Sequence, residues 1–197
     1  MGMVVAVENV SLDGVMQSPA GPDEDTRGGF DRGGWAVAAF QRDPEAAQAA
    51  MAQQGGGTGA MLFGRRTYFD VVGHWLATTE PNPFTAILRD TPKYVASRTR
   101  TEPLPYPNST LLTGDVLGRI AELKRGEGDL VVLGSGTLVR DLAATGLLDR
   151  YVLSTIPVVV GTGMRLFGDT YLPLRVLRSV TSRTGIVTAT YEIVRDA

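Results

Sequence analysis

The segment LVVLGSGTLVRDL, from Leu130 to Leu142, restricts the possible folds of this chain more than any other segment. Its first four residues, 130–133, form a continuous apolar run, which is typical of a short strand buried on both faces. The glycines at 134 and 136 interrupt that run, and a helical pattern follows them. A strand, a glycine turn and a helix in this order indicate an α/β fold with parallel strands.

The expected helix has Leu138, Val139 and Leu142 on one apolar face. Thr137 is a suitable N-cap for this helix, and Gly146 is a suitable end. The free N–H groups of the first turn, together with the preceding glycines, would form a cradle for an anion such as phosphate. Tight turns with two glycines also occur where nothing binds, so a purely structural turn stays an alternative.

The same order of elements recurs earlier in the chain. Apolar strands predicted at 60–63 and 93–96 are followed directly by polar turns at 64–67 and 97–98. In a parallel sheet the C-terminal ends of the strands meet at one edge, where ligands bind. We therefore expect the turns at Gly64, Ser97 and Gly134 to open onto the same side of the molecule.

Other segments complete the expected fold. Further strands are predicted at 4–7, 111–112 and 150–160, with a final antiparallel hairpin at 174–181 and 186–193. Helices are predicted after two N-caps, from Asp43 to about Gln53 with a stop at 55–57, and from Asp115 to about 126. The segment 14–34 is predicted to be a long loop that covers a site or is mobile. The pattern predicts a mainly parallel sheet with helices on both faces.

Length and composition narrow the class of protein. The 197 residues, of which 43% are hydrophobic and 20% charged, suit one soluble globular domain over residues 1–197. The formal net charge of −2 argues against a nucleic-acid-binding surface. No apolar segment approaches the length of a membrane span, and no secretion signal is evident, so we expect a cytoplasmic protein with no membrane association.

Several kinds of site are excluded by the residue types that are scarce. The chain has no cysteine, which excludes disulfides, thiolate metal ligands and a cysteine nucleophile. No group of acidic residues has the spacing of a calcium loop, so no metal site is predicted. His74, the only histidine, is expected to be structural or on the surface.

The polar turns carry groups that suit a phosphorylated cofactor. Arg65 and Arg66 follow a glycine at a strand end, where a guanidinium can bind phosphate oxygens and Thr67 can add a hydroxyl group. Ser97 and Arg98 repeat this pattern after the next strand. Arginine and serine favour the 2′-phosphate of NADP(H) over the unmodified ribose of NAD, which usually binds a carboxylate. Solvated surface arginines are the alternative.

Together these motifs resemble a known family. GRRTY, SRT and VVLGSGTLV are similar, in order and spacing, to segments of dihydrofolate-reductase-like proteins, particularly the C-terminal reductase domain of RibD from riboflavin biosynthesis. SLDG at 11–14, GGFDRGGW at 28–35 and VVVGTGMRLFGD at 158–169 are similar to stand-alone members of that group. The resemblance implies a three-layer fold with a mixed, mostly parallel sheet of about eight strands, NADPH as cofactor and a possible homodimer.

The resemblance also assigns roles to individual residues. The turn at 64–67 matches the segment that holds the adenosine 2′-phosphate and the pyrophosphate, and 97–98 matches the segment beside the adenine ribose. The turn at 134–138 matches the pyrophosphate loop, and Ala6 would lie near the nicotinamide. The implied cofactor-binding residues are Ala6, Gly64, Arg65, Arg66, Thr67, Ser97, Arg98, Gly134, Ser135, Gly136, Thr137 and Leu138.

Two residues are candidates for the substrate side. Asp13 is the best-placed acid for orienting a substrate or relaying a proton, although an aspartate before a glycine also forms turns. Trp35 could stack on a substrate ring or could belong to the core.

Two functions are compatible with these features. The first is an NADPH-dependent reductase that transfers hydride to a C=O or C=N carbon of a small pterin-like, pyrimidine-like or ribosylamino substrate. The second is a non-catalytic NADP(H)-binding sensor or sequestering protein. The second is favoured by Gln48, which stands where dihydrofolate reductases carry an acid. The retained SLDG turn favours the first.

Overall fold

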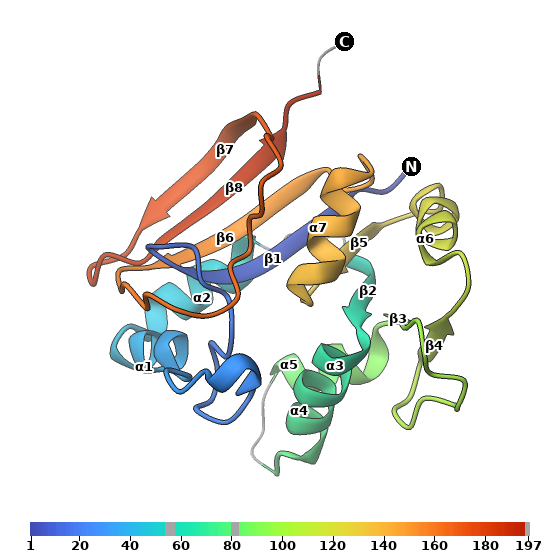
Figure 1. The fold of residues 1–197 in the computed structure, drawn as a ribbon, viewed down its shortest axis with the longest axis horizontal. Helices are drawn as coiled ribbons and strands as arrows, with labels where there is room; N and C mark the ends of the chain where they lie inside the picture. The colour runs from blue at the N-terminus through green and yellow to red at the C-terminus, as the bar shows by residue number, and fades with distance from the viewer. Residues whose placement is uncertain (54–57, 80–82, 196–197) are drawn as a thin grey trace. The chain divides into compact units, whose positions relative to one another are not determined.

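The structure is a computed structural model, and it describes residues 1–53, 58–79 and 83–195. The described residues form an eight-stranded sheet in the order β4-β3-β2-β5-β1-β6-β8-β7 (Figure 1). The chain divides into two compact units. Unit 1 comprises Met1–Ala6 and Gly57–Leu148, and unit 2 comprises Val7–Gly56 and Asp149–Ala197.

Unit 1 contains the parallel part of the sheet. Strand β5 pairs in parallel with β2 and with the first residues of β1. Strand β3 pairs in parallel with both β2 and β4. The strands are β1 (Val4–Ser11), β2 (Thr58–Gly64), β3 (Lys93–Ala96), β4 (Ser109–Leu112) and β5 (Asp129–Val132). Parallel pairing places the C-terminal ends of these strands along one edge.

Helical segments follow the strands of unit 1. They are α3 (Arg65–Thr67), the π-helix η2 (Tyr68–Val72), α4 (Gly73–Ala77), α5 (Pro83–Asp90), α6 (Val116–Lys124) and α7 (Gly136–Ala144). A buried cluster joins β2, β3, η2 and α5 through Met61, Phe63, Tyr68, Val72, Leu88 and Val95. This packing fixes the end of β2, from which the first polar turn leaves.

Unit 2 contains the antiparallel part of the sheet. Strand β8 (Val187–Ile193) pairs antiparallel with both β6 (Arg150–Ile156) and β7 (Leu174–Thr181). Its helical segments are η1 (Arg27–Gly29), α1 (Trp35–Arg42) and α2 (Pro44–Gln53). The residues Ala36, Ala46, Ile156 and Ile186 form one buried cluster, and Val15, Phe30 and Val160 form another.

The eight-stranded, mostly parallel sheet and the C-terminal antiparallel hairpin are confirmed. The bounds of β3 and β7 agree with the predicted ones, and the backbone N–H of Ala46 donates to the Asp43 carboxylate at 3.2 Å, as expected for the N-cap of α2. The predicted stop at 55–57 lies outside the described residues. A single domain over residues 1–197 and helices on both faces of the sheet stay predictions.

Two expectations were wrong, and two helices were not predicted. The strand predicted at 150–160 ends at Ile156, because Pro157 has no N–H to donate to a neighbouring strand. Helix α7 begins at Gly136 with Ser135 as N-cap, so Thr137 is inside the helix and does not cap it. Helices α1 and α5 were not predicted.

The described helices include none that is long and apolar enough to cross a bilayer.

Candidate functional site

A pocket of about 440 Å³ lies in unit 1 at the C-terminal edge of its parallel strands. Residues at the ends of four strands and in the turns that follow them line it: Gly64 and Arg65 at β2, 96–99 at β3, 114–117 after β4, and Ser135, Thr137, Leu138 and Asp141 after β5. The sequence predicts that the turns at Gly64, Ser97 and Gly134 open onto one side of the molecule. Residues of all three turns line this pocket, so the prediction is confirmed.

The turns after β2 and β5, which both contribute residues to the pocket lining, approach each other closely. The Gly64 N–H donates to the Gly134 carbonyl at 3.0 Å. A Cβ atom on Gly64 would lie 2.5 Å from the Ser135 Oγ, and one on Gly134 would lie 3.1 Å from the Thr67 side chain. Gly134 also has a φ of 81°, which favours glycine. Glycine at both positions therefore allows the turns after β2 and β5 to approach this closely.

Helix α7 presents its N-terminus to the pocket. Ser135 makes no side-chain capping bond, and the first intrahelical bond to its carbonyl comes from the Val139 N–H at 3.0 Å. The N–H groups at the start of such a helix have no intrahelical partner and carry partial positive charge. Thr137 and Leu138 line the pocket at this turn. This end of α7 is thus suited to an anion.

Two arginines and two aspartates supply the charged groups of the pocket lining. Arg65 is exposed and makes no ion pair with any residue that the structure describes. The Arg98 guanidinium lies 3.2 Å from the Asp141 carboxylate. The Asp115 carboxylate accepts from the Gly118 N–H at 3.0 Å and so caps α6. Arg65 is therefore the arginine of the pocket with no competing acid.

The Ser97 side chain organises the turn after β3. Its Oγ accepts from the backbone N–H groups of Thr99 at 3.3 Å and Arg100 at 3.0 Å. The Arg100 side chain turns away to donate to the carbonyls of Glu102 and Pro103. Ser97 is buried, and its hydroxyl hydrogen stays available for a ligand, because both of these bonds use the oxygen as acceptor.

The predicted cofactor residues divide into two groups. Those that line the pocket are Gly64, Arg65, Ser97, Arg98, Ser135, Thr137 and Leu138. The pocket lining does not include Ala6, Arg66, Thr67, Gly134 or Gly136. A Cβ atom on Gly134 would lie 3.1 Å from the Thr67 side chain, and Ala6 is fully buried in β1 opposite Val132. Their roles as cofactor contacts stay predictions.

Some lining residues were not predicted. The turn 114–117 after β4 repeats the strand, glycine and helix order seen at Gly64 and Gly134, so the same pattern could have identified it. Asp141 gives no such signal, because its pairing with Arg98 joins residues 43 positions apart.

Asp13 lies in unit 2, where hydrogen bonds surround its carboxylate. Its Oδ1 accepts from the Ser11 hydroxyl at 2.7 Å and the Val160 N–H at 3.0 Å, and its Oδ2 accepts from the Gly161 N–H at 2.9 Å. The Arg165 guanidinium is 3.6 Å from Oδ2.

These bonds, with the Ser11 hydroxyl first, lower the pKa of Asp13 to about 2. At neutral pH Asp13 is therefore an ionised hydrogen-bond acceptor that joins two loops. This agrees with a structural role, the alternative to catalysis. A proton relay through Asp13 stays a prediction, which the low pKa disfavours.

Trp35 begins α1 and lies between the two buried clusters of unit 2. Its Nε1–H donates to the Gln17 carbonyl at 2.9 Å. The Gln17 side chain in turn donates to the carbonyls of Asp25 and Arg27 and accepts from the Met164 N–H. These hydrogen bonds connect several parts of the loop 14–34. The contacts of Trp35 agree with the alternative that this residue belongs to the core. Substrate stacking by Trp35 stays a prediction.

His74 is exposed in α4, with its ring edge-on to Trp75 at 5.3 Å between centroids. It is not among the residues that line the pocket. These contacts agree with the expected structural or surface role.

Comparisons with known proteins agree with this arrangement. A curated relative, an uncharacterised protein named YyaP from Bacillus subtilis, is 31% identical over 140 residues, which are 66% of this chain and 72% of YyaP. Among solved structures, a riboflavin biosynthesis protein from Shewanella sp. PV-4 has a TM-score of 0.65 at 23% identity, covering 98% of this chain and 99% of that one. Dihydrofolate reductase from Enterococcus faecalis, complexed with NADP(H), has a TM-score of 0.60 at 14% identity, covering 98% and 96%.

These structural neighbours establish a shared fold. The family model described as the RibD C-terminal domain matches residues 3–188, which is nearly the whole chain. This chain therefore belongs to the RibD C-terminal domain family.

Proposed function

We propose that this protein is an NADPH-dependent reductase. In this proposal hydride passes to a C=O or C=N carbon of a small substrate that is pterin-like, pyrimidine-like or carries a ribosylamino group. The observation that carries the proposal is the pocket of unit 1, which combines Arg65, Ser97, Arg98 and the open N-terminus of α7 at one edge of the parallel strands. Membership of a reductase family supports it.

The groups of the pocket fit the phosphates of NADPH. The first turn of α7 offers N–H groups to a pyrophosphate. The close approach of Gly64 to Ser135 keeps the backbone of the turn after β2 near this end of the helix. Arg65, exposed and without an ion pair to any described residue, offers a guanidinium to the 2′-phosphate. Bound NADPH would supply the hydride, so the tasks of the protein are to bind, orient and shield.

A second candidate function, an NADP(H)-binding sensor or sequestering protein without turnover, is favoured by one observation. The Asp13 carboxylate is held by three hydrogen bonds, with a pKa of about 2, so it carries no proton to deliver at neutral pH. A reductase would then take its proton from water or from the substrate.

One experiment separates the two functions. The intrinsic tryptophan fluorescence of the purified protein is titrated with NADPH and with NADH, and NADPH oxidation is then followed with pterins, ribosylaminopyrimidines and simple carbonyl compounds. Tight NADPH binding with turnover of one substrate class supports the reductase. Tight binding without turnover on the whole panel supports the sensor, and absence of binding contradicts both. Size-exclusion chromatography of the same sample tests the homodimer, which stays a prediction.

A further inference from the structure

The charges of the unit 1 pocket balance, which is unusual for a site that would hold several phosphates. Its described lining contains Arg65 and Arg98 with Asp115 and Asp141. A phosphate monoester carries close to two negative charges at neutral pH, so each aspartate opposes it. The two aspartates differ in how freely their carboxylates can interact with a ligand.

The Asp115 carboxylate has a structural role as a helix cap. Its carboxylate accepts the Gly118 N–H at 3.0 Å and caps α6. Asp141, on α7, differs because its carboxylate has a single partner among the described residues, Arg98 at 3.2 Å. Replacing Asp141 therefore changes the pocket without removing a helix cap.

The Arg98–Asp141 pair is able to exchange partners. The Arg98 side chain is 81% exposed and that of Asp141 is 42% exposed, so water screens the pair and its strength is modest. A phosphate dianion presents the same bidentate acceptor geometry to the guanidinium as a carboxylate does, with more charge. A 2′-phosphate that binds Arg98 would compete with Asp141 for the guanidinium.

Asp141 has the opposite effect on NADH. An unmodified ribose presents a 2′-hydroxyl, which can donate to a carboxylate, as the ribose of NAD does in dinucleotide-binding folds. Asp141 therefore disfavours a 2′-phosphate twice, by its charge and by holding Arg98, and it does not disfavour a free 2′-hydroxyl.

We propose that Asp141 is the specificity-determining residue of this pocket, competing with the 2′-phosphate for Arg98 and so limiting the preference for NADPH over NADH. The inference rests on the proposed function, since it assumes that a nicotinamide cofactor occupies the pocket. The ratio of the NADH dissociation constant to the NADPH dissociation constant is expected to rise about three- to tenfold in D141N.

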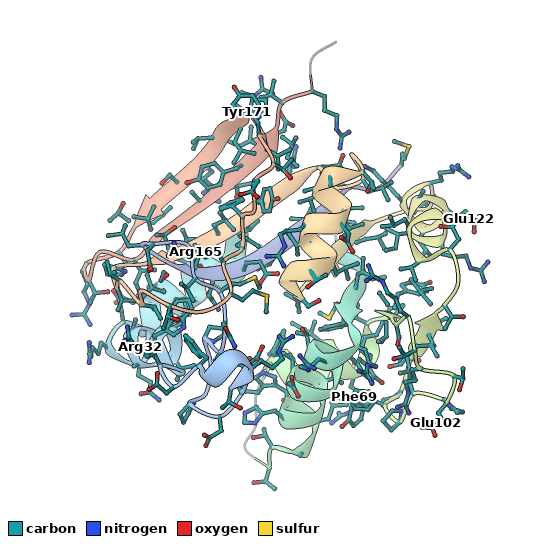
Figure 2. The ribbon with its side chains drawn as sticks, viewed as in Figure 1. Arg32, Phe69, Glu102, Glu122, Arg165 and Tyr171 are labelled. Carbon is teal, nitrogen blue, oxygen red and sulfur yellow. The ribbon has the colours of Figure 1, made fainter. Side chains whose placement is uncertain are left out.

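The test measures dissociation constants by tryptophan fluorescence for wild type, D141N and E122Q. Glu122, labelled in Figure 2, lies on α6 outside the pocket lining and pairs with Arg119 at 3.8 Å, so E122Q removes one negative charge from an exposed ion pair elsewhere in unit 1. The ligands are NADPH, NADH, adenosine 2′,5′-bisphosphate and AMP. Tighter binding of NADPH and the bisphosphate by D141N alone supports the proposal.

Three results would overturn it. Equal changes in D141N and E122Q would assign the effect to general charge. Equal weakening of NADPH and NADH in D141N would place Asp141 against the adenosine part that both share. An undiminished effect of D141N in an R98Q background would exclude competition for Arg98. In each of these results wild type still binds cofactor, so the proposed function stands, whereas no binding of either cofactor by wild type overturns both.

Discussion

The Ser135 side chain occupies the space that a side chain on Gly64 would need. The two residues come from turns 71 positions apart in the sequence, and a Cβ at position 64 would lie 2.5 Å from the Ser135 Oγ. Gly64 has φ −71° and ψ 149°, which any residue adopts, so the requirement for glycine comes from this contact and not from the backbone. The contact joins the turns that follow β2 and β5.

Gly64→Ala is therefore expected to push Ser135 and the start of α7 away from β2. We expect a loss of about 1–3 kcal/mol in the free energy of unfolding, as for other overpacked sites, and weaker cofactor binding. Urea denaturation and NADPH titration measure the two effects. The double variant Gly64→Ala/Ser135→Gly removes the obstructing Ser135 side chain and should recover part of both. No recovery would show that the cost arises elsewhere.

Lys93 is buried at the start of β3 and holds the end of α5. Its Nζ donates to the carbonyls of Leu88 and Thr91. Lys93→Met leaves both carbonyls without this donor, so we expect a loss of about 1–3 kcal/mol in the free energy of unfolding, measured by urea denaturation. Arg89→Met removes a cation from an exposed position on the same helix and should change stability little. Equal losses in both variants would contradict the capping role.

The pKa of Asp13 makes a prediction about acid stability. This pKa is about 2 in the folded chain, below its ordinary 3.8, because the Ser11 hydroxyl and the Val160 and Gly161 N–H groups favour the ionised form. The ionised carboxylate therefore stabilises the fold above about pH 4, and this contribution is lost as the pH falls towards 2. Asp13→Asn should unfold at lower urea concentration than wild type at neutral pH.

The difference between wild type and Asp13→Asn should then shrink in acid. Asp31 is the control, because its side chain is 84% exposed and its Arg32 partner, labelled in Figure 2, is 3.9 Å away. Asp31→Asn should differ little from wild type at any pH. A difference for Asp13→Asn that is constant down to about pH 3 would contradict the lowered pKa.

The sequence was sufficient for the parts of the fold that local rules determine. The apolar runs before Gly64, Ser97 and Gly134 were long enough to identify β2, β3 and β5, and the rule that parallel strands end at one edge then brought their turns together. Asp43 and Asp115 are recognisable as N-caps because capping depends on residues two or three positions apart.

The remaining features depend on long-range contacts or on weak local signals. Helix α5 begins at Pro83; proline is acceptable in the first turn of a helix, but a proline-rich stretch is also typical of a connection, so the local signal for this helix is weak. The Arg98–Asp141 pair and the bonds from Val160 and Gly161 to Asp13 join distant residues, so no periodicity announces them. For the same reason, a catalytic role and a structural role for Asp13 are both compatible with the sequence.

The last prediction concerns the 2′-phosphate and uses two adjacent arginines. Arg65 lines the pocket and Arg66 does not, although both are exposed in α3. Arg65→Glu reverses a charge beside the expected phosphate, so NADPH binding should weaken at least tenfold, corresponding to about 1.4 kcal/mol, with a smaller loss for NADH. Fluorescence titration of both cofactors gives the comparison. Arg66→Glu makes the same charge change at an adjacent residue outside the pocket lining, so it should weaken NADPH binding less than Arg65→Glu does. Equal losses of NADPH and NADH in Arg65→Glu would remove Arg65 from the 2′-phosphate site.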